Sequence, residues 1–159
     1  MKNELTGTIR ALLEEYKKAV NELITVIKPL NSKEIQIIRD DKTTNDNCRS
    51  IQTILTHVVY AGYGYTNFIE NHLGSTIERR PKKLFENADE YIGELKGMFE
   101  DCENFFMKHP NIELEEYDPS KKILTHWGQV YDIDQIMEHA IVHVLKHRRQ
   151  IQRFLSPQA

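Results

Sequence analysis

The sequence predicts an all-α fold, specifically a four-helix bundle, and three features of the chain support this. Four segments of about 20 residues carry apolar side chains at helical spacing, the pattern of helices that bury one face. Glycine numbers 7 and proline 5, which is too few for a turn-rich β fold. The length of 159 residues suits one domain, so we expect residues 1–159 to form a single bundle.

The first two expected helices are separated by a polar connector. The first helix covers about residues 4 to 28 and ends before Pro29, which cannot continue it. The connector spans residues 31–47, and the second helix covers about residues 48 to 70. The sequence GSTIERRPKK, at residues 74–83, predicts a loop after it.

The third and fourth expected helices cover about residues 88 to 108 and 133 to 155. Each begins with residues that can form a capping box, in which two side chains satisfy free backbone N–H groups. The two pairs are Asn87 with Glu90 and Asp132 with Gln135. The stretch 111–131 is an expected connector, in which Trp127 closes one end of the bundle or walls a pocket. His126 beside it is a weaker candidate for a site.

Composition excludes several classes of function. Lys and Arg number 21 against 24 Asp and Glu, so no basic excess indicates nucleic acid. No apolar run is long enough to span a membrane, and MKNELTGTIR lacks the apolar core of a signal peptide, so we expect a cytoplasmic protein. Cys48 and Cys102 form no CxxC motif and are expected to be free thiols, with Cys102 in the core.

Histidines on the fourth expected helix have the spacing of metal ligands. The segment EHAIVHVLKH places His139, His143 and His147 four residues apart. Residues at this spacing stack on one helix face, with Cβ atoms roughly 6 Å apart. Two such imidazoles can reach one metal at about 2.0–2.1 Å each. A solvated helix face can carry the same spacing, so the pattern is moderately specific.

The angular position of each histidine ranks the three candidates. With roughly 100° between successive residues, the apolar stripe centres between Ala140 and Val144. His147 lies roughly 30° from that centre, His143 roughly 70° and His139 roughly 110°. His147 therefore faces the core, His143 flanks it and His139 lies at the edge. An inward histidine needs a partner for its ring nitrogens.

A third ligand is expected from the second helix. His57 lies beside Ile54 and Ala61 on the flank of that helix's apolar stripe. Three histidines would leave the fourth metal position open, as catalytic rather than structural zinc sites do. His72 and His109 lie near helix ends, where a cation favours the helix dipole, and are expected to have no role in the site.

Two segments resemble the DinB/YfiT-like family. SIQTILTHVVYAGYGY is similar to the family's pattern of a histidine after an apolar turn, and HVLKHRRQI is similar to its closing motif H-x-x-x-H-R-x-Q-I. The resemblance places His57 as first ligand and His143 and His147 as second and third, whereas His139 has no ligand counterpart. Arg149 departs from the pattern, since many members carry glycine there.

The resemblance also implies a function. It implies an often dimeric four-helix bundle with a divalent metal, Ni²⁺ or Zn²⁺. Some members are thiol S-transferases that use bacterial low-molecular-weight thiols such as bacillithiol, and others resemble hydrolases. In either case a metal with an open position acidifies a bound thiol or water, and the resulting nucleophile attacks a small-molecule substrate.

The sequence also offers candidate neighbours for the three histidines, and it leaves more than one function open for the site. Asp134 and Glu138 are the acidic residues nearest in sequence that could hold the outer imidazole nitrogens. Tyr60 and Tyr63 either line a pocket or pack in the core. One alternative is a non-catalytic stress-response protein whose metal is structural or sensory, and another is a bundle with no metal. We favour the enzyme because an open three-histidine site is demanding to maintain without chemistry.

Overall fold

The computed structural model describes residues 4–157, and within this range the chain is mostly helical. The described residues form four long helices, and all four were expected from the sequence. Their bounds are α1 Gly7–Ile27, α3 Ile51–His72, α4 Ala88–Lys108 and α5 Ile133–Leu155. The expected bounds agree for α4 and α5, and the largest differences are the later starts of α1 and α3.

Short elements connect the long helices. They are α2 (Ser32–Gln36), 3-10 turns at Asp46–Cys48 and Pro119–Lys121, and the strands β1 (Ile123–Leu124) and β2 (Val130–Tyr131). The two strands pair antiparallel, with Ile123 opposite Tyr131. Gly128, with a φ of 91°, makes the tight turn between them. The expected plain connector at 111–131 therefore contains a small hairpin, which the sequence analysis missed because each strand has only two residues.

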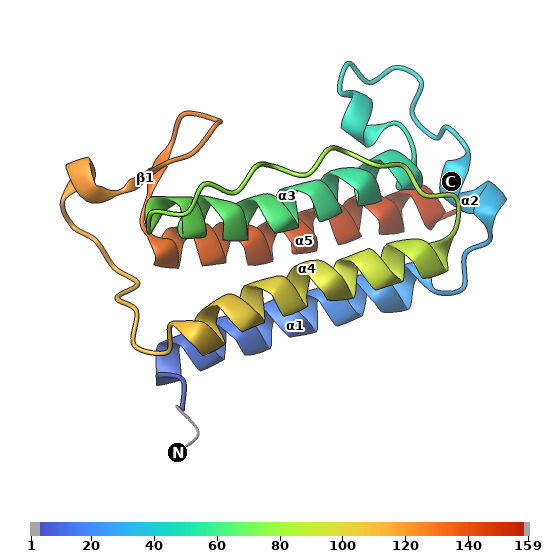
Figure 1. Ribbon diagram of the computed structural model, residues 1–159. Coiled ribbons are helices and arrows are strands. Elements are labelled where there is room, and N and C mark those ends of the chain that lie inside the picture. The colour runs from blue at the N-terminus through green and yellow to red at the C-terminus, as the bar shows by residue number, and fades with distance from the viewer. Residues whose placement is uncertain (1–3, 158–159) are drawn as a thin grey trace.

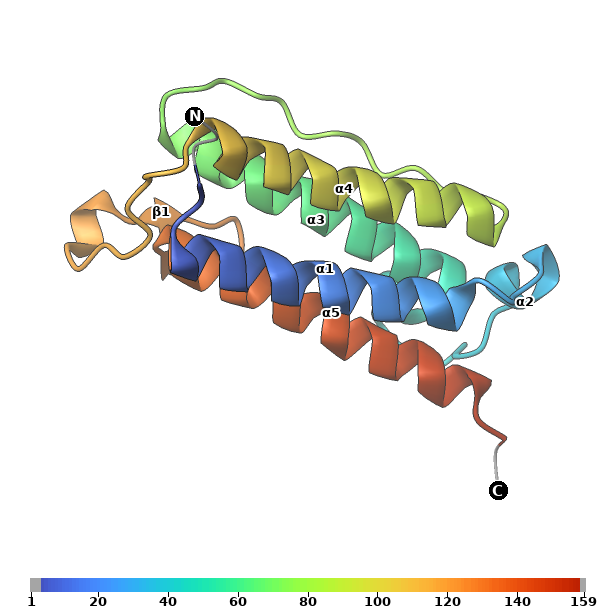
Figure 2. The ribbon, with the colours of Figure 1, turned by 90° about the horizontal axis from the view of Figure 1, so that it is seen from below.

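The long helices lie side by side around one core (Figures 1 and 2). Each of α1 and α3 contacts both α4 and α5. The helices α3 and α4 run in the same direction, because residues 74–87 return along the outside of α3 before α4 begins (Figure 1). This long crossover excludes a simple up-down order and lays a polar segment beside α3.

The helix starts follow the expected caps with one exception. Asp132 accepts from the backbone N–H of Gln135 at 2.8 Å, and the Gln135 side chain accepts from the backbone of Asp132 at 3.0 Å. Asn87 likewise accepts from the backbone of Glu90 at 3.0 Å. The prediction of a reciprocal bond from the Glu90 side chain to Asn87 is wrong. The Glu90 carboxylate accepts instead from the backbone N–H of Glu86 at 3.2 Å. That N–H lies within its reach at the end of the crossover.

The apolar faces of all four long helices meet in the core. Cys102 is buried there as expected, and both cysteines are free thiols. The contact between α3 and α4 is especially close, because a Cβ at Gly62 would overlap the Sδ of Met98. Within residues 4–157, no helix combines the length and apolarity needed to cross a membrane.

Candidate metal centre

Three histidines from two helices converge on the side of the core where α3 faces α5. The candidate ligand nitrogens of His57, His143 and His147 all lie within 4.8 Å of one another. The Nε2 atoms of His57 and His143 are 3.0 Å apart, and the rings of His143 and His147 have centroids 4.5 Å apart. The structure therefore brings together the three residues that the sequence named. That they bind a metal stays a prediction.

The position of each histidine follows from helical spacing. His147 is only 3% exposed, whereas His143 and His57 are partly buried, which agrees with the expected angular order. His139, one turn earlier on α5, lies outside the convergent group. Its ring instead stacks on Trp127, with centroids 4.8 Å apart and planes 16° apart.

A hydrogen bond sets the tautomer of His147. Its Nδ1 donates to Oε1 of Gln150 at 2.9 Å, and burial lowers the pKa of the ring, so His147 is neutral at pH 7. Its Nε2 then carries a lone pair and no proton. This Nε2 is buried and has no hydrogen-bond partner among the described residues. An orphaned buried acceptor of this kind costs about 1–3 kcal/mol, which a ligand at Nε2 would offset.

The other two histidines are also neutral at pH 7. Burial, followed by the neighbouring imidazole of His147, lowers the pKa of His57 to about 4. The same two causes lower the pKa of His143 to about 2. Because both rings are neutral, only one hydrogen can lie between their Nε2 atoms. The cluster therefore offers three uncharged imidazoles, and a shift of the shared hydrogen to an outer ring nitrogen would direct three nitrogen lone pairs into a small region.

This donor set fits a divalent transition metal. Four ligands arranged tetrahedrally at about 2.0–2.1 Å place neighbouring nitrogens roughly 3.3–3.4 Å apart. The 3.0 Å separation of His57 and His143 is close to that value, and their rings need only small movements to reach it. The free Nε2 of His147 is the third donor. Three imidazoles without a thiolate or carboxylate suit zinc and nickel.

The charged groups around the cluster are cations. Besides His147, the charges that lower the pKa of His57 come from Lys82, Lys146 and Arg79. Within the described range, no carboxylate is among the groups that shift the pKa of His57, His143 or His147. A ligand at this site therefore enters a positive environment that favours anions.

The acidic partners considered from the sequence do not hold the imidazoles. Glu138 is exposed, and Asp134 lies in the first turn of α5, where its backbone donates to Leu114. Gln150 takes the expected role for His147. Gln150 was not expected as the partner of His147, because carboxylates are the usual partners of such imidazoles. Its spacing of three residues from His147 was nevertheless a usable signal.

Aromatic rings line the cluster on the side of the hairpin. The ring of Tyr65 meets His143 edge-on at a centroid distance of 5.8 Å and His139 at 5.4 Å. Trp127, on the hairpin, packs on His139 and edge-on against Tyr65 at 6.1 Å. Trp127 thus packs near the end of α3 and the start of α5, as expected of a side chain that closes one end of the bundle, and its alternative role as the wall of a pocket stays a prediction.

The remaining histidines lie apart from the cluster. His72 is the last residue of α3, and His109 caps the end of α4, as expected. His126 is exposed on the hairpin, where its Nδ1 lies 3.2 Å from Nη1 of Arg79.

A separate cavity of about 230 Å³ lies between α3 and the crossover. Tyr60 and Tyr63 both line it, and Tyr63 is also buried in the core, so both of the roles expected for these tyrosines occur. Its other lining residues on α3 are Thr56 and Val59, so the cavity lies on the opposite side of Tyr60 from His57.

No protein-family model matches the chain, and no curated protein matches it. The likeness to the DinB/YfiT-like family therefore rests on the two sequence motifs alone.

Proposed function

We propose that this chain is a DinB/YfiT-like four-helix bundle in which His57, His143 and His147 hold one divalent metal, Ni²⁺ or Zn²⁺. The observation that carries the proposal is the convergence of three neutral imidazoles, one of which has a buried Nε2 with no partner. The two family-like motifs and the single long crossover support the same assignment.

The reaction we propose is thiol transfer, from a bacterial low-molecular-weight thiol such as bacillithiol to an electrophilic small molecule. When bound, a metal with an open fourth position would acidify a thiol or a water molecule there. Gln150 fixes the ring of His147, and the cationic surroundings from Lys82, Lys146 and Arg79 stabilise an anionic nucleophile. Trp127 and Tyr65 limit access of water from the hairpin side.

Hydrolysis is the second reaction that the same site supports. A thiol that loses its proton is already a nucleophile, whereas hydrolysis of a stable bond usually recruits a carboxylate base. The described groups acting on the cluster are neutral or cationic, which favours thiol transfer. A cytoplasmic location, expected from the polar N-terminal sequence, and a homodimer, implied by the family resemblance, remain further predictions.

The metal content of the untagged protein tests the site. We expect about one Ni or Zn per chain by inductively coupled plasma mass spectrometry, lost in His57→Ala and His147→Ala. His139→Ala is the matched control, because it removes a partly buried histidine of the same helix from outside the cluster. Equal loss in all three variants, or no metal after reconstitution, would overturn the ligand assignment.

Activity is then tested on the metal-loaded protein with bacillithiol and an activated aryl halide. Thioether formation that depends on both the metal and the thiol is the expected result. A protein that keeps its metal, yet transfers no thiol and hydrolyses no activated ester, has a structural or sensory metal instead.

A further inference from the structure

Arg79 is unlike its neighbours on the crossover. It is partly buried, whereas Glu78 and Arg80 beside it are exposed. Its guanidinium lies over the ring of Tyr60, 3.8 Å from the centroid, and packs so closely on α3 that a Cβ at Gly64 would lie 2.7 Å from its Nη2. An exposed segment thus places a partly buried guanidinium against the surface of α3.

No carboxylate of the described residues pairs with the charge of Arg79. Among residues 4–157, no carboxylate lies within 4.0 Å of its guanidinium. Its Nη1 donates to the neutral ring of His126 at 3.2 Å, and its buried Nε has no hydrogen-bond partner. Partly buried cations are usually paired, because their removal from water is otherwise uncompensated. An anion from outside the chain would supply the missing charge.

Arg79 also lies on the same face of α3 as the histidine cluster. Gly64 follows His57 by seven residues, which is two helical turns and nearly the same direction from the axis. Tyr60 is one turn from His57. The guanidinium therefore lies roughly 5–10 Å along the helix from His57. Tyr65, next to Gly64 in the sequence, contacts His143 edge-on at a centroid distance of 5.8 Å.

We propose that Arg79 binds an anionic group of the substrate, a carboxylate or a phosphate, while the reacting end of that substrate lies at the histidine cluster. This inference rests on the proposed function, because it takes the cluster to be the reactive site. A guanidinium suits the role, since its planar donors match the oxygens of either group. Lys82 and Lys146 add to the positive potential that attracts such a molecule.

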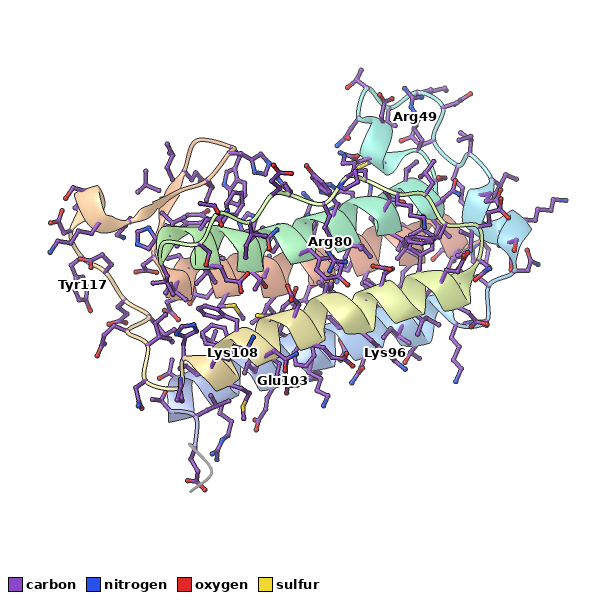
Figure 3. All side chains as sticks on the ribbon, in the orientation of Figure 1. Arg49, Arg80, Lys96, Glu103, Lys108 and Tyr117 are labelled. Carbon is purple, nitrogen blue, oxygen red and sulfur yellow. The ribbon has the colours of Figure 1, made fainter. Side chains whose placement is uncertain are left out.

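A structural role for Arg79 makes a different prediction, and Arg80 offers the matched control. Arg80 lies on the same crossover (Figure 3) and covers the ring of Tyr63, 3.9 Å from the centroid. The two residues are thus adjacent arginines, each stacked on a tyrosine of α3. If stacking only fastens the crossover, removing either guanidinium has a similar effect. If Arg79 binds an anion, only its removal changes ligand preference.

The test uses protein loaded with Co²⁺, whose absorption reports a thiol at the metal. The probes are ω-mercapto-carboxylates of graded length, ω-mercapto-alkyl phosphates of the same lengths, and the matched ω-mercapto-alcohols. We expect one chain length at which an anionic probe binds at least about tenfold more tightly than its alcohol. The better of the two anionic series identifies carboxylate or phosphate as the group. Arg79→Met should make the anionic probe bind no more tightly than its alcohol, and Arg80→Met should retain the preference.

Each outcome separates the two proposals. If the wild-type protein shows no preference, or if Arg79→Met retains it, the inference is wrong while the metal site stands. If the cobalt spectrum responds to no thiol, the proposed function fails. Circular dichroism, together with the cobalt spectrum in the presence of an alcohol probe, checks that Arg79→Met is folded. Arg79→Lys, which returns the positive charge, should restore part of the preference for the anionic probe.

Discussion

Helix α3 packs differently against α4 and against α5. Against α4, Gly62 allows Met98 to pack closely, and the buried hydroxyls of Thr56 and Tyr91 satisfy each other at 2.6 Å. Against α5, His57 meets two other histidines, and the cluster leaves buried ring nitrogens without partners. One face of the helix is thus optimised for stability, whereas the other keeps unsatisfied polar atoms where a ligand can use them.

Enlarging Gly62 should have the largest effect, because it forces α3 and α4 apart. Gly62→Leu should lower the free energy of unfolding by about 3 kcal/mol, since its side chain would overlap Met98 in a packed core. Chemical denaturation at pH 7 measures this. Gly93→Ala on α4 is the control, because no described atom outside the local backbone of its own helix lies within 4 Å of that added Cβ, and alanine favours the helix. An unchanged stability in Gly62→Leu would mean that the close contact is absent.

Acid should weaken the α5 face of the metal-free protein. Histidine has a pKa near 6.5 when unfolded, whereas burial lowers the folded pKa of His57 to about 4. The unfolded chain therefore binds more protons, so stability is full above about pH 6.5 and falls as the pH drops towards 4. Each such histidine contributes up to about 1.4 kcal/mol per pH unit in this window.

Comparison of the wild type with His57→Leu separates the effect of His57 on stability from that of the titrating carboxylates, which both proteins share. In denaturation series between pH 7 and pH 4.5, His57→Leu should lose stability less steeply than the wild type. Identical slopes for the two proteins would show that His57 titrates normally in the folded state.

Replacing His147 should separate stability from binding. His147→Leu removes the buried Nε2 that lacks a partner and fills similar space with apolar atoms, while Gln150 can turn to water. The free energy of unfolding of the metal-free protein should rise by about 1 kcal/mol, although metal binding is lost. A fall of several kcal/mol would instead mean that His147 stabilises the fold, and the contrast between the two faces of α3 would disappear.

The smallest effect is expected at Arg149, where the chain departs from the DinB/YfiT-like pattern. Its side chain is exposed on α5, so Arg149→Ala should change the free energy of unfolding by less than about 0.5 kcal/mol. Metal content should stay that of the wild type. Loss of metal in this variant would show that α5 is arranged differently around the cluster.

Local periodicity was enough to predict most of what lies within a single helix. It located α5, its cap at Asp132 and the inward direction of His147, because burial repeats along a helix with a fixed period. It also brought His57 into consideration, although its distance from His143 was not predictable from spacing. The four long helices therefore follow from patterns that the chain carries locally.

Features that depend on contacts between distant segments could not be predicted in this way. The hairpin around Gly128 has strands too short to produce a pattern. The direction of the crossover, and with it the position of Arg79 on Tyr60, depends on which helices become neighbours. The choice of Gln150 over Asp134 or Glu138 depends on which side chain reaches a ring nitrogen in the folded protein.

The packing of α1 against α5 has a consequence for biosynthesis. These helices are far apart in the chain, and Arg148 pairs with Glu22 across 126 positions. While a ribosome makes the protein, α1 can pack on α4 first, but the part of its apolar face that α5 covers stays exposed until α5 has emerged, and closing so long a loop slows folding. Because α5 also carries His143 and His147, the nascent chain acquires a complete core and a complete histidine cluster at the same late moment.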